Sequence, residues 1–205
     1  MKQLAIIGAG GHGKVVAEIA ELVGWKDILF FDDAFPRIEN VGVWKVKGTM
    51  NDLLACRDDC SSLIVAIGSN EVRLQKSNFL LSQGFKLETL IHPNATVSKY
   101  ADIKAGTVVI AGAVINPFAS VGMGSIINTS CLIDHDCIIG EGVHISPGAN
   151  VAGGVEVGDL SWLGIGSTVK QGLKIGNSVV VGAGAVVVNN VPDNHVVKGI
   201  PAKKR

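Results

Sequence analysis

A histidine between two carboxylates is the clearest candidate for catalysis in this sequence of 205 residues. The segment reads Asp134-His135-Asp136, in a part of the chain that otherwise carries few charges. An imidazole accepts a proton near neutral pH, and a neighbouring carboxylate fixes its tautomer and stabilises its cation. We therefore predict that His135 is a general base and that one of the two aspartates orients its ring. A surface histidine with only a structural role is the alternative.

A glycine-rich loop near the start of the chain is the second candidate site. The apolar run at residues 4–7 leads into Gly8, Gly10 and Gly13, which match the pattern G-x-G-x-x-G, and helical apolar spacing follows. Such a loop brings backbone N–H groups and a helix N-terminus to a phosphate. We predict that the loop contacts a phosphate-bearing ligand through Gly10, Gly11 and His12.

The size of the region around this loop limits which class of ligand it can bind. Asp32 and Asp33 end the second predicted strand, where they can accept hydrogen bonds from a base or sugar, and Gly68 follows the third strand. A dinucleotide needs two mononucleotide-binding halves, and only about 85 residues, enough for one half, precede the next region. We therefore favour a nucleotide or nucleotide-sugar over a nicotinamide dinucleotide, with a purely structural glycine turn as a further alternative.

The candidate base lies within a long repeat of six residues. Small residues often stand two positions before each repeated aliphatic residue, as at Ala113, Cys131 and Ala149. Neither an α-helix nor a single strand has this period, and it is typical of hexapeptide β-helices, in which about 18 residues make one turn. The repeated aliphatic positions are Val97, Ile103, Val109, Ile115, Val121, Ile127, Ile133, Ile139, Ile145, Val151, Val157, Leu163, Val169, Ile175, Val181 and Val187.

These patterns predict two domains. Residues 1–88 read as strand, glycine loop, helix, strand, helix and strand, which is an α/β domain resembling half of a Rossmann fold. Residues 89–205 form the all-β coil, a parallel β-helix. Two residues of this coil, His135 and His144, are nine positions apart, or one and a half sides of a turn. We therefore expect them not to share an edge within one subunit.

Composition argues against several other classes of protein. Lys and Arg total 18, as do Asp and Glu, so the net charge of zero gives no electrostatic support for binding nucleic acid. No apolar run is long enough to span a membrane, and the start of the chain does not resemble a signal peptide, so we expect a cytoplasmic protein. Cys131 and Cys137 occupy small inward positions of the repeat and are expected to pack there. No cysteine pair completes a zinc ligand set, so no metal is predicted.

The chain resembles, from end to end, the bacterial sugar acetyltransferases of the sialic-acid O-acetyltransferase and UDP-bacillosamine N-acetyltransferase type. The resemblance rests on the glycine loop at residues 8–14 and on the motifs at residues 30–33, 127–129, 134–137 and 199–203. It implies a left-handed parallel β-helix, a homotrimer, acetyl-CoA between neighbouring coils and a nucleotide-sugar on the N-terminal domain.

The same resemblance implies roles for single residues. The family's base matches His135, and the acid that supports it matches Asp136. Its oxyanion donor matches the backbone of Gly153. The residues that correspond to its acetyl-CoA contacts are His144, Gly153, Ile165 and Ala183, the last of which is often glycine in relatives.

We therefore expect an acetyl-CoA-dependent N-acetyltransferase that modifies the C4 amine of a nucleotide-linked 4-amino-4,6-dideoxy sugar, with UDP-4-amino-4,6-dideoxy-N-acetylglucosamine favoured. The product would serve the synthesis of a surface glycan or glycoprotein. O-acetylation of sialic acid or another sugar is an alternative within the same chemistry. A metal-dependent, carbonic-anhydrase-like β-helix enzyme and a non-catalytic nucleotide-sugar binding scaffold are alternatives from other classes.

Overall fold

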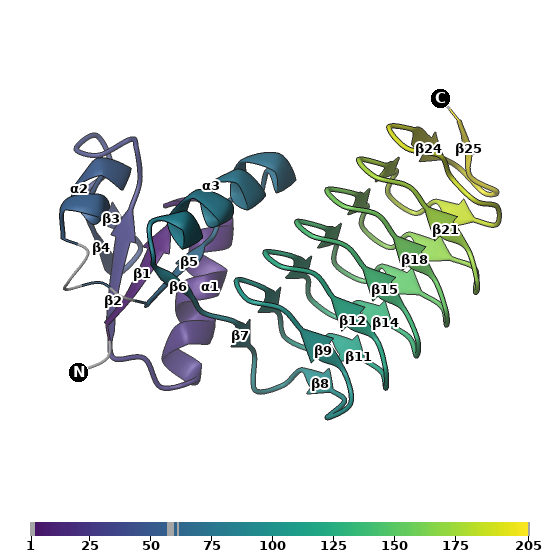
Figure 1. Cartoon of the computed structure of the whole chain (residues 1–205), viewed down its shortest axis with the longest axis horizontal. Helices are drawn as coiled ribbons and strands as arrows, with labels where there is room; N and C mark the ends of the chain where they lie inside the picture. The colour runs from purple at the N-terminus through teal and green to yellow at the C-terminus, as the bar shows by residue number, and fades with distance from the viewer. Residues whose placement is uncertain (1–2, 57–59, 61, 205) are drawn as a thin grey trace. The chain divides into compact units, whose positions relative to one another are not determined.

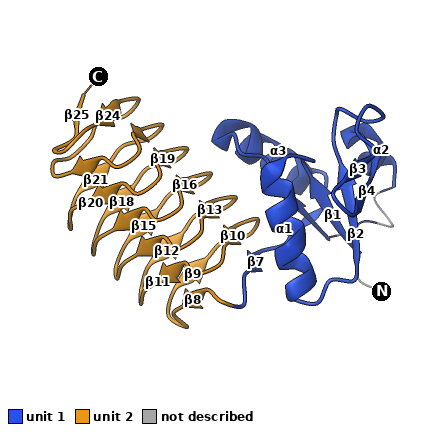
Figure 2. Cartoon of the chain, turned by 180° about the vertical axis from the view of Figure 1, so that it is seen from behind, with its two compact units in different colours: residues 1–93 blue, residues 94–205 orange. Residues whose placement is uncertain are grey.

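The computed structural model describes residues 3–56, 60 and 62–204, and the chain divides into two compact units, Met1–Pro93 and Asn94–Arg205 (Figure 2). The division falls slightly later than the boundary between residues 88 and 89 that the change of pattern predicts. The short strand β7 (Leu90–Ile91), which contacts α1 (Gly11–Leu22), falls within the first unit.

The first unit is an α/β domain with one sheet. Its strand order is β3-β4-β2-β1-β5-β6, and all neighbouring strands are parallel except β3 and β4. The strands are β1 (Gln3–Ile7), β2 (Asp27–Phe31), β3 (Asn40–Val41), β4 (Trp44–Gly48), β5 (Ser62–Val65) and β6 (Lys86–Leu87). The helices are α1 (Gly11–Leu22), α2 (Met50–Ala55) and α3 (Asn70–Ser82).

The central strand β1 explains the long apolar run at the start of the chain. Leu4, Ala5 and Ile6 are fully buried, as expected for a parallel strand with neighbours on both edges. Helix α1 follows the glycine loop and buries Val16 and Ile19. The antiparallel hairpin of β3 and β4 was not predicted from the sequence, although the alternation of apolar residues with lysines in β4 is typical of a half-exposed strand. Its partner β3 has only two residues and gives no such pattern.

The second unit is a parallel β-helix built from two-residue strands (Figure 1). Successive coils stack their strands into three groups. The first stack contains β10 (Val108–Val109), β13 (Ile126–Ile127), β16 (His144–Ile145), β19 (Trp162–Leu163) and β22 (Val180–Val181). The second contains β8 (Thr96–Val97), β11 (Val114–Ile115), β14 (Leu132–Ile133), β17 (Asn150–Val151), β20 (Thr168–Val169) and β23 (Val186–Val187). The third contains β9 (Asp102–Ile103), β12 (Ser120–Val121), β15 (Ile138–Ile139), β18 (Glu156–Val157) and β21 (Lys174–Ile175).

The six-residue repeat becomes the core of this coil. In the middle coils the repeated aliphatic residue is the second residue of its strand and is fully buried, as Ile127, Ile145 and Leu163 show. The small residue at the corner is also buried, and the hydroxyl groups of Thr107, Ser125 and Ser161 donate to carbonyls there, as Ser125 Oγ does to Gly140 O over 3.0 Å. Small size and an internal acceptor therefore allow these residues to turn the chain inside the coil.

The end of the coil is closed by a change of pairing. Strand β24 (Val196–Lys198) continues the first stack beside β22, and β25 (Lys203–Lys204) pairs with β24 in the antiparallel direction. The second unit therefore ends on a short strand that carries two lysines, a composition that discourages further strand addition.

Candidate active site

His135 and Asp136 lie at the corner of the coil between β14 and β15, where they form a close pair. His135 Nδ1 is 2.7 Å from Asp136 Oδ2, and both side chains are exposed. The carboxylate accepts a hydrogen bond here, so Nδ1 carries the proton and Nε2 keeps its lone pair. The hydrogen bond to Asp136, followed by the negative charge of Asp134, raises the pKa of His135 above its ordinary value.

The backbone at this corner sets the geometry of the pair. Asp136 has φ of 59°, in the left-handed region, and its N–H donates to Pro117 O on the preceding coil over 3.2 Å. Aspartate tolerates this conformation better than most residues. The turn thus allows adjacent residues to bring their side chains together.

The second aspartate has a different set of partners. Asp134 Oδ1 accepts the backbone N–H of His135 over 2.8 Å and Nδ2 of Asn116, on the preceding coil, over 2.7 Å. The hydrogen bond from Asn116, followed by that from the His135 backbone, lowers the pKa of Asp134. Of the two aspartates that flank His135, Asp136 contacts the ring and Asp134 holds the backbone.

Gly153 lies beside the imidazole on the next coil. The adjacent Gly154 donates its N–H to His135 O over 2.9 Å, which fixes the register of the two corners. A Cβ on Gly153 would come within 2.6 Å of His135 Nε2, so no larger residue fits while the ring keeps this position. His135 Nε2 therefore borders the space that a side chain at position 153 would fill.

His144 lies on a different face from His135, as the spacing of nine residues requires. It is half-buried in β16 of the first stack, and its Nε2 is 3.0 Å from Asn128 Nδ2. Trp162 on the next coil stacks on the imidazole, with ring centroids 5.6 Å apart and planes 4° from parallel. The sequence did not indicate this cluster, because the three side chains come from different repeats.

Ile165 and Ala183 occupy the corner that follows the first stack. They are on successive coils, since Gly184 N–H donates to Ile165 O over 2.8 Å, and both side chains are exposed. The corner therefore presents small and apolar side chains to solvent, beside the stack that carries His144.

The glycine loop of the first unit has the close backbone approach that its sequence predicts. Gly8 has φ of 110°, and a Cβ on Gly13 would meet the side chain of Phe30 at 2.9 Å, as well as the backbone of Gly8. At Gly10 and Gly11, by contrast, a Cβ would meet nothing, so this part of the loop is open. His12 follows in the first turn of α1. The open side of the loop is where a ligand has room to approach.

The two predicted aspartates of this unit have different surroundings. Asp32 accepts the N–H of Ala9 over 2.7 Å and that of Ala34 over 2.8 Å, so each of its carboxylate oxygens accepts a hydrogen bond from the backbone. Asp33 is exposed and forms an ion pair of 3.2 Å with Lys76 of α3. A hydrogen bond from the backbone of Met50 is the largest cause that lowers the pKa of Asp33.

Asp32 and Asp33 border a small cavity of about 90 Å³ at the carboxyl end of the sheet. Gly8 and Lys76 also line it, together with Ile67, the neighbour of Gly68. Gly8 of the loop and both aspartates thus border one cavity, whereas Gly10, Gly11, His12 and Gly68 do not line it. Lys76 was not predicted because a lysine in a helix carries no local signal for a site.

Comparison with known proteins covers both units. The family model described as the PglD N-terminal domain matches residues 3–80. The UDP-N-acetylbacillosamine N-acetyltransferase of Bacillus subtilis is 38% identical over 113 residues, which are 54% of this chain. The match spans about half, 52%, of that curated protein.

Two solved structures match almost the whole chain. The acetyltransferase domain of PglB from Neisseria gonorrhoeae, in complex with acetyl coenzyme A, is 42% identical with a TM-score of 0.96, covering 100% of this chain and 99% of that one. This chain belongs to the hexapeptide-repeat sugar acetyltransferases. A histidine-to-asparagine mutant of perosamine N-acetyltransferase from Caulobacter crescentus, with CoA and GDP-perosamine, is 38% identical with a TM-score of 0.95, covering 99% of this chain and 96% of that one.

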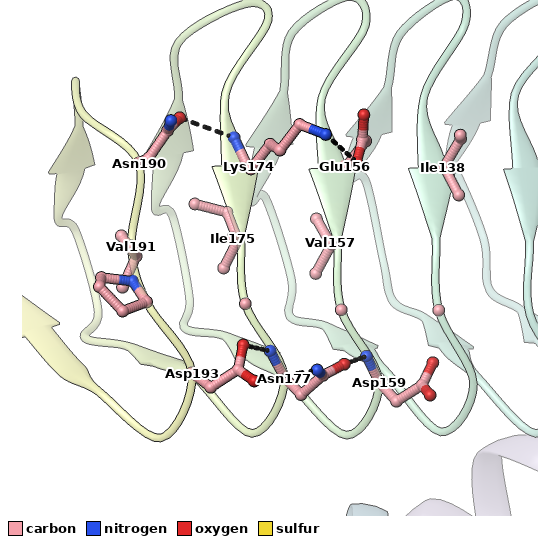
Figure 3. A pocket seen from close by; sticks show the side chains of 14 residues that line it. Ile138, Glu156, Val157, Asp159, Lys174, Ile175, Asn177, Asn190, Val191 and Asp193 are labelled. Carbon is pink, nitrogen blue, oxygen red and sulfur yellow. Dashed lines mark hydrogen bonds and ion pairs between the residues drawn. The ribbon is translucent and has the colours of Figure 1, made fainter.

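In this acetyltransferase a groove lies along the third stack, and none of the predicted site residues lines it. It has a volume of about 570 Å³ and contains an ion pair of 2.9 Å between Glu156 and Lys174 (Figure 3). Along its edge, Asp159, Asn177 and Asp193 accept backbone N–H groups of preceding coils. These contacts hold successive turns of the coil in register, which is a structural role.

Within residues 3–56, 60 and 62–204, no group of three or more His, Cys, Asp or Glu side chains is arranged to hold a metal ion. No helix in that same part of the chain is both long and apolar enough to cross a membrane. Cys131 and Cys137 are buried as predicted, and burial raises the pKa of Cys131 to about 12, which disfavours a thiolate.

Proposed function

We propose that this protein is an acetyl-CoA-dependent N-acetyltransferase that modifies the C4 amine of a nucleotide-linked 4-amino sugar. The observation that carries the proposal is the pair of His135 and Asp136, with the ring in the space that the missing side chain of Gly153 leaves. The family to which the chain belongs transfers acetyl groups to sugars, and this pair supplies the proton acceptor that such a transfer needs.

His135 acts as the base through Nε2. It removes a proton from the sugar amine as the amine nitrogen bonds to the acetyl carbonyl carbon. Asp136 holds the proton on Nδ1, so that Nε2 faces the substrate, and its charge offsets the cation that forms on the ring. Asp134 supports both residues by holding the His135 backbone.

The backbone N–H of Gly153 serves as the donor to the developing oxyanion. Acetyl-CoA supplies an acetyl thioester, whose thiolate is a good leaving group, so a covalent enzyme intermediate is not needed. The absence of a side chain at Gly153 is what allows the base and the backbone to share one corner of the coil, as the reaction requires. In this proposal acetyl-CoA contacts the corner at Gly153, together with His144 and the exposed corner of Ile165 and Ala183.

The nucleotide part of the substrate belongs to the first unit. Gly10, Gly11 and His12 lie where the loop opens at the start of α1, a site suited to phosphate. Asp32 orders the loop through its backbone, and Asp33 is the exposed carboxylate that can accept a hydrogen bond from base or ribose. Gly68, where a Cβ would also meet nothing, leaves the adjacent loop open.

Among nucleotide-linked sugars we favour UDP-4-amino-4,6-dideoxy-N-acetylglucosamine. The Bacillus subtilis relative, named a UDP-N-acetylbacillosamine N-acetyltransferase, supports UDP. The solved perosamine N-acetyltransferase complex contains a GDP-linked sugar, which makes GDP the main competitor. We further propose that the enzyme works in the cytoplasm as a homotrimer, with each acetyl-CoA held between two coils.

A thiol-release assay with acetyl-CoA tests this function. The acceptors should include UDP-, dTDP- and GDP-linked 4-amino sugars, with sialic acid as the hydroxyl acceptor. We expect release of CoA with a nucleotide-linked 4-amino sugar and little with the hydroxyl acceptor. If the protein binds a nucleotide-sugar but releases no CoA from acetyl-CoA with any of these acceptors, it is a binding scaffold, and the proposal is contradicted.

A further inference from the structure

Three side chains on consecutive coils form a cluster around His144. Asn128 follows β13, His144 lies in β16 and Trp162 in β19, and all three belong to the first stack or the corner after it. Their contacts determine which nitrogen of His144 carries the proton, which no single residue of the cluster would reveal.

The orientation of the Asn128 amide is fixed by its neighbour. Asn128 Oδ1 lies 2.8 Å from the backbone N of Thr129 and 3.3 Å from Thr129 Oγ1. The backbone N–H can only donate, so the atom that faces it must be the amide oxygen. The other amide atom, which faces His144, is therefore the NH₂ group and not an oxygen.

The tautomer of His144 follows from this orientation. Asn128 Nδ2 is 3.0 Å from His144 Nε2, and the NH₂ group has no lone pair with which to accept a proton. Nε2 must therefore be the acceptor, which leaves the proton of the neutral ring on Nδ1. A proton on Nε2 would place two N–H groups against each other.

The plane of the His144 ring is fixed from the other side. The Trp162 indole stacks parallel to the imidazole, and its Nε1 donates to Ser146 Oγ over 2.7 Å. Ser146 is buried, so this hydrogen bond anchors an indole that is otherwise half exposed. With Asn128 at one edge and Trp162 on one face, the ring has little freedom to turn.

We propose that Asn128 and Trp162 are positioning residues that hold His144 as a neutral hydrogen-bond donor toward acetyl-CoA. The inference rests on the proposed function, because it assumes that His144 contacts this substrate. Both histidines then have the same tautomer and opposite roles. His135 donates Nδ1–H to Asp136 and offers Nε2 as a base, whereas His144 accepts the Asn128 NH₂ group at Nε2 and donates through Nδ1–H.

The tautomer can be measured directly by long-range ¹H–¹⁵N correlation NMR on protein with labelled histidines, with a His144→Gln variant to assign the signals. We expect the wild-type His144 ring to show a protonated Nδ1 and an unprotonated Nε2. In Asn128→Asp, a carboxylate oxygen replaces the NH₂ group, so the proton should move to Nε2. A wild-type ring protonated on Nε2, or an unchanged ring in Asn128→Asp, would overturn the inference.

Substrate binding supplies the second measurement. Asn128→Asp should raise the acetyl-CoA Kd by about tenfold, the equivalent of roughly one lost hydrogen bond, with a much smaller change in the sugar KM. Trp162→Leu should raise the acetyl-CoA Kd more than Trp162→Phe, which keeps an aromatic stack. Val180→Ala, on the next coil of the same stack, is the matched control and should leave the Kd unchanged. Equal Kd values in all four variants would contradict a positioning role.

The outcomes separate this inference from the proposed function. If the wild-type protein neither binds acetyl-CoA nor releases CoA, the proposed function is contradicted. The inference is then contradicted too, because His144 has no acetyl-CoA to which it can donate a hydrogen bond. If the wild-type protein transfers acetyl groups while the tautomer or the Kd values disagree, the inference alone fails.

Discussion

Nδ1 of His135 lies 2.7 Å from Oδ2 of Asp136, although the two residues are adjacent in the chain. Adjacent side chains usually point apart in an extended segment. The left-handed backbone at Asp136, with φ of 59°, removes that separation. The proposed base and the carboxylate that orients it are therefore positioned by one corner of the coil.

Replacing Asp136 should change the pH dependence of the reaction. The Asp136 carboxylate stabilises the charged imidazole and is the largest cause of the raised pKa of His135. A base works when it is unprotonated, so the rate rises with pH through this pKa. In Asp136→Asn the pKa falls, and the acidic limb of the kcat profile should move to lower pH while kcat at the plateau decreases.

The same profile for Asp134→Asn gives the comparison, because Asp134 raises the His135 pKa as a smaller cause and does not touch the ring. A larger displacement of the acidic limb in Asp134→Asn than in Asp136→Asn would indicate that Asp134 orients the ring and would contradict the role given to Asp136.

Adding one methyl group at Gly153 should impair catalysis by displacing the base. The new Cβ would come within 2.6 Å of His135 Nε2, so the ring must move. We expect kcat of Gly153→Ala to fall by about tenfold or more, since small displacements of catalytic groups are costly. Circular dichroism and thermal melting should show that the coil remains folded.

A double mutant isolates the cause of that loss. In a His135→Ala background the imidazole is gone, so Gly153→Ala should have little further effect on kcat. Losses that simply multiply would show that Gly153 acts independently of the ring.

The glycine loop is expected to affect the sugar alone. In His12→Ala the sugar KM should rise several-fold, by roughly the loss of one hydrogen bond to the ligand. The acetyl-CoA Kd, measured by calorimetry, should be nearly unchanged, because His12 belongs to the first unit and the predicted acetyl-CoA contacts to the second. A Kd for acetyl-CoA that changes as much as the sugar KM would contradict separate sites.

Assembly is a further expectation of the proposed function. In a head-to-tail interface each coil gives one face and receives a different one, and three is the smallest number of copies that closes such a ring. Light scattering should therefore give a mass about three times that of the 21.3 kDa chain. A monomeric mass with full activity would rule out a shared site.

The parts of the fold that depend on a repeating pattern could be predicted from the sequence. The six-residue period is confirmed by the buried column of Ile127, Ile145 and Leu163, because inward packing constrains every coil in the same way. The hairpin of β3 and β4 was missed, since β3 has only two residues and the position of β4 depends on pairing with β2.

The candidate site, like the fold, could be predicted only in part from the sequence. The residue types at His135 and Asp136 indicate acid–base chemistry, but only the backbone turn shows that Asp136 and not Asp134 contacts the ring. The ion pair of Asp33 with Lys76 and the stack of His144 on Trp162 join residues from separate elements. Such contacts depend on tertiary structure and leave no local signal in the sequence.

The most direct test of the account is kcat for acetyl transfer by the His135→Ala variant. If His135 is the general base, kcat should fall by roughly 10²- to 10⁴-fold, the usual contribution of a positioned proton acceptor, while both KM values change little. The variant should also lose the acidic limb of its pH profile. A kcat close to that of the wild-type protein, with the acidic limb retained and only KM raised, would show that His135 binds substrate and would contradict its role as the base.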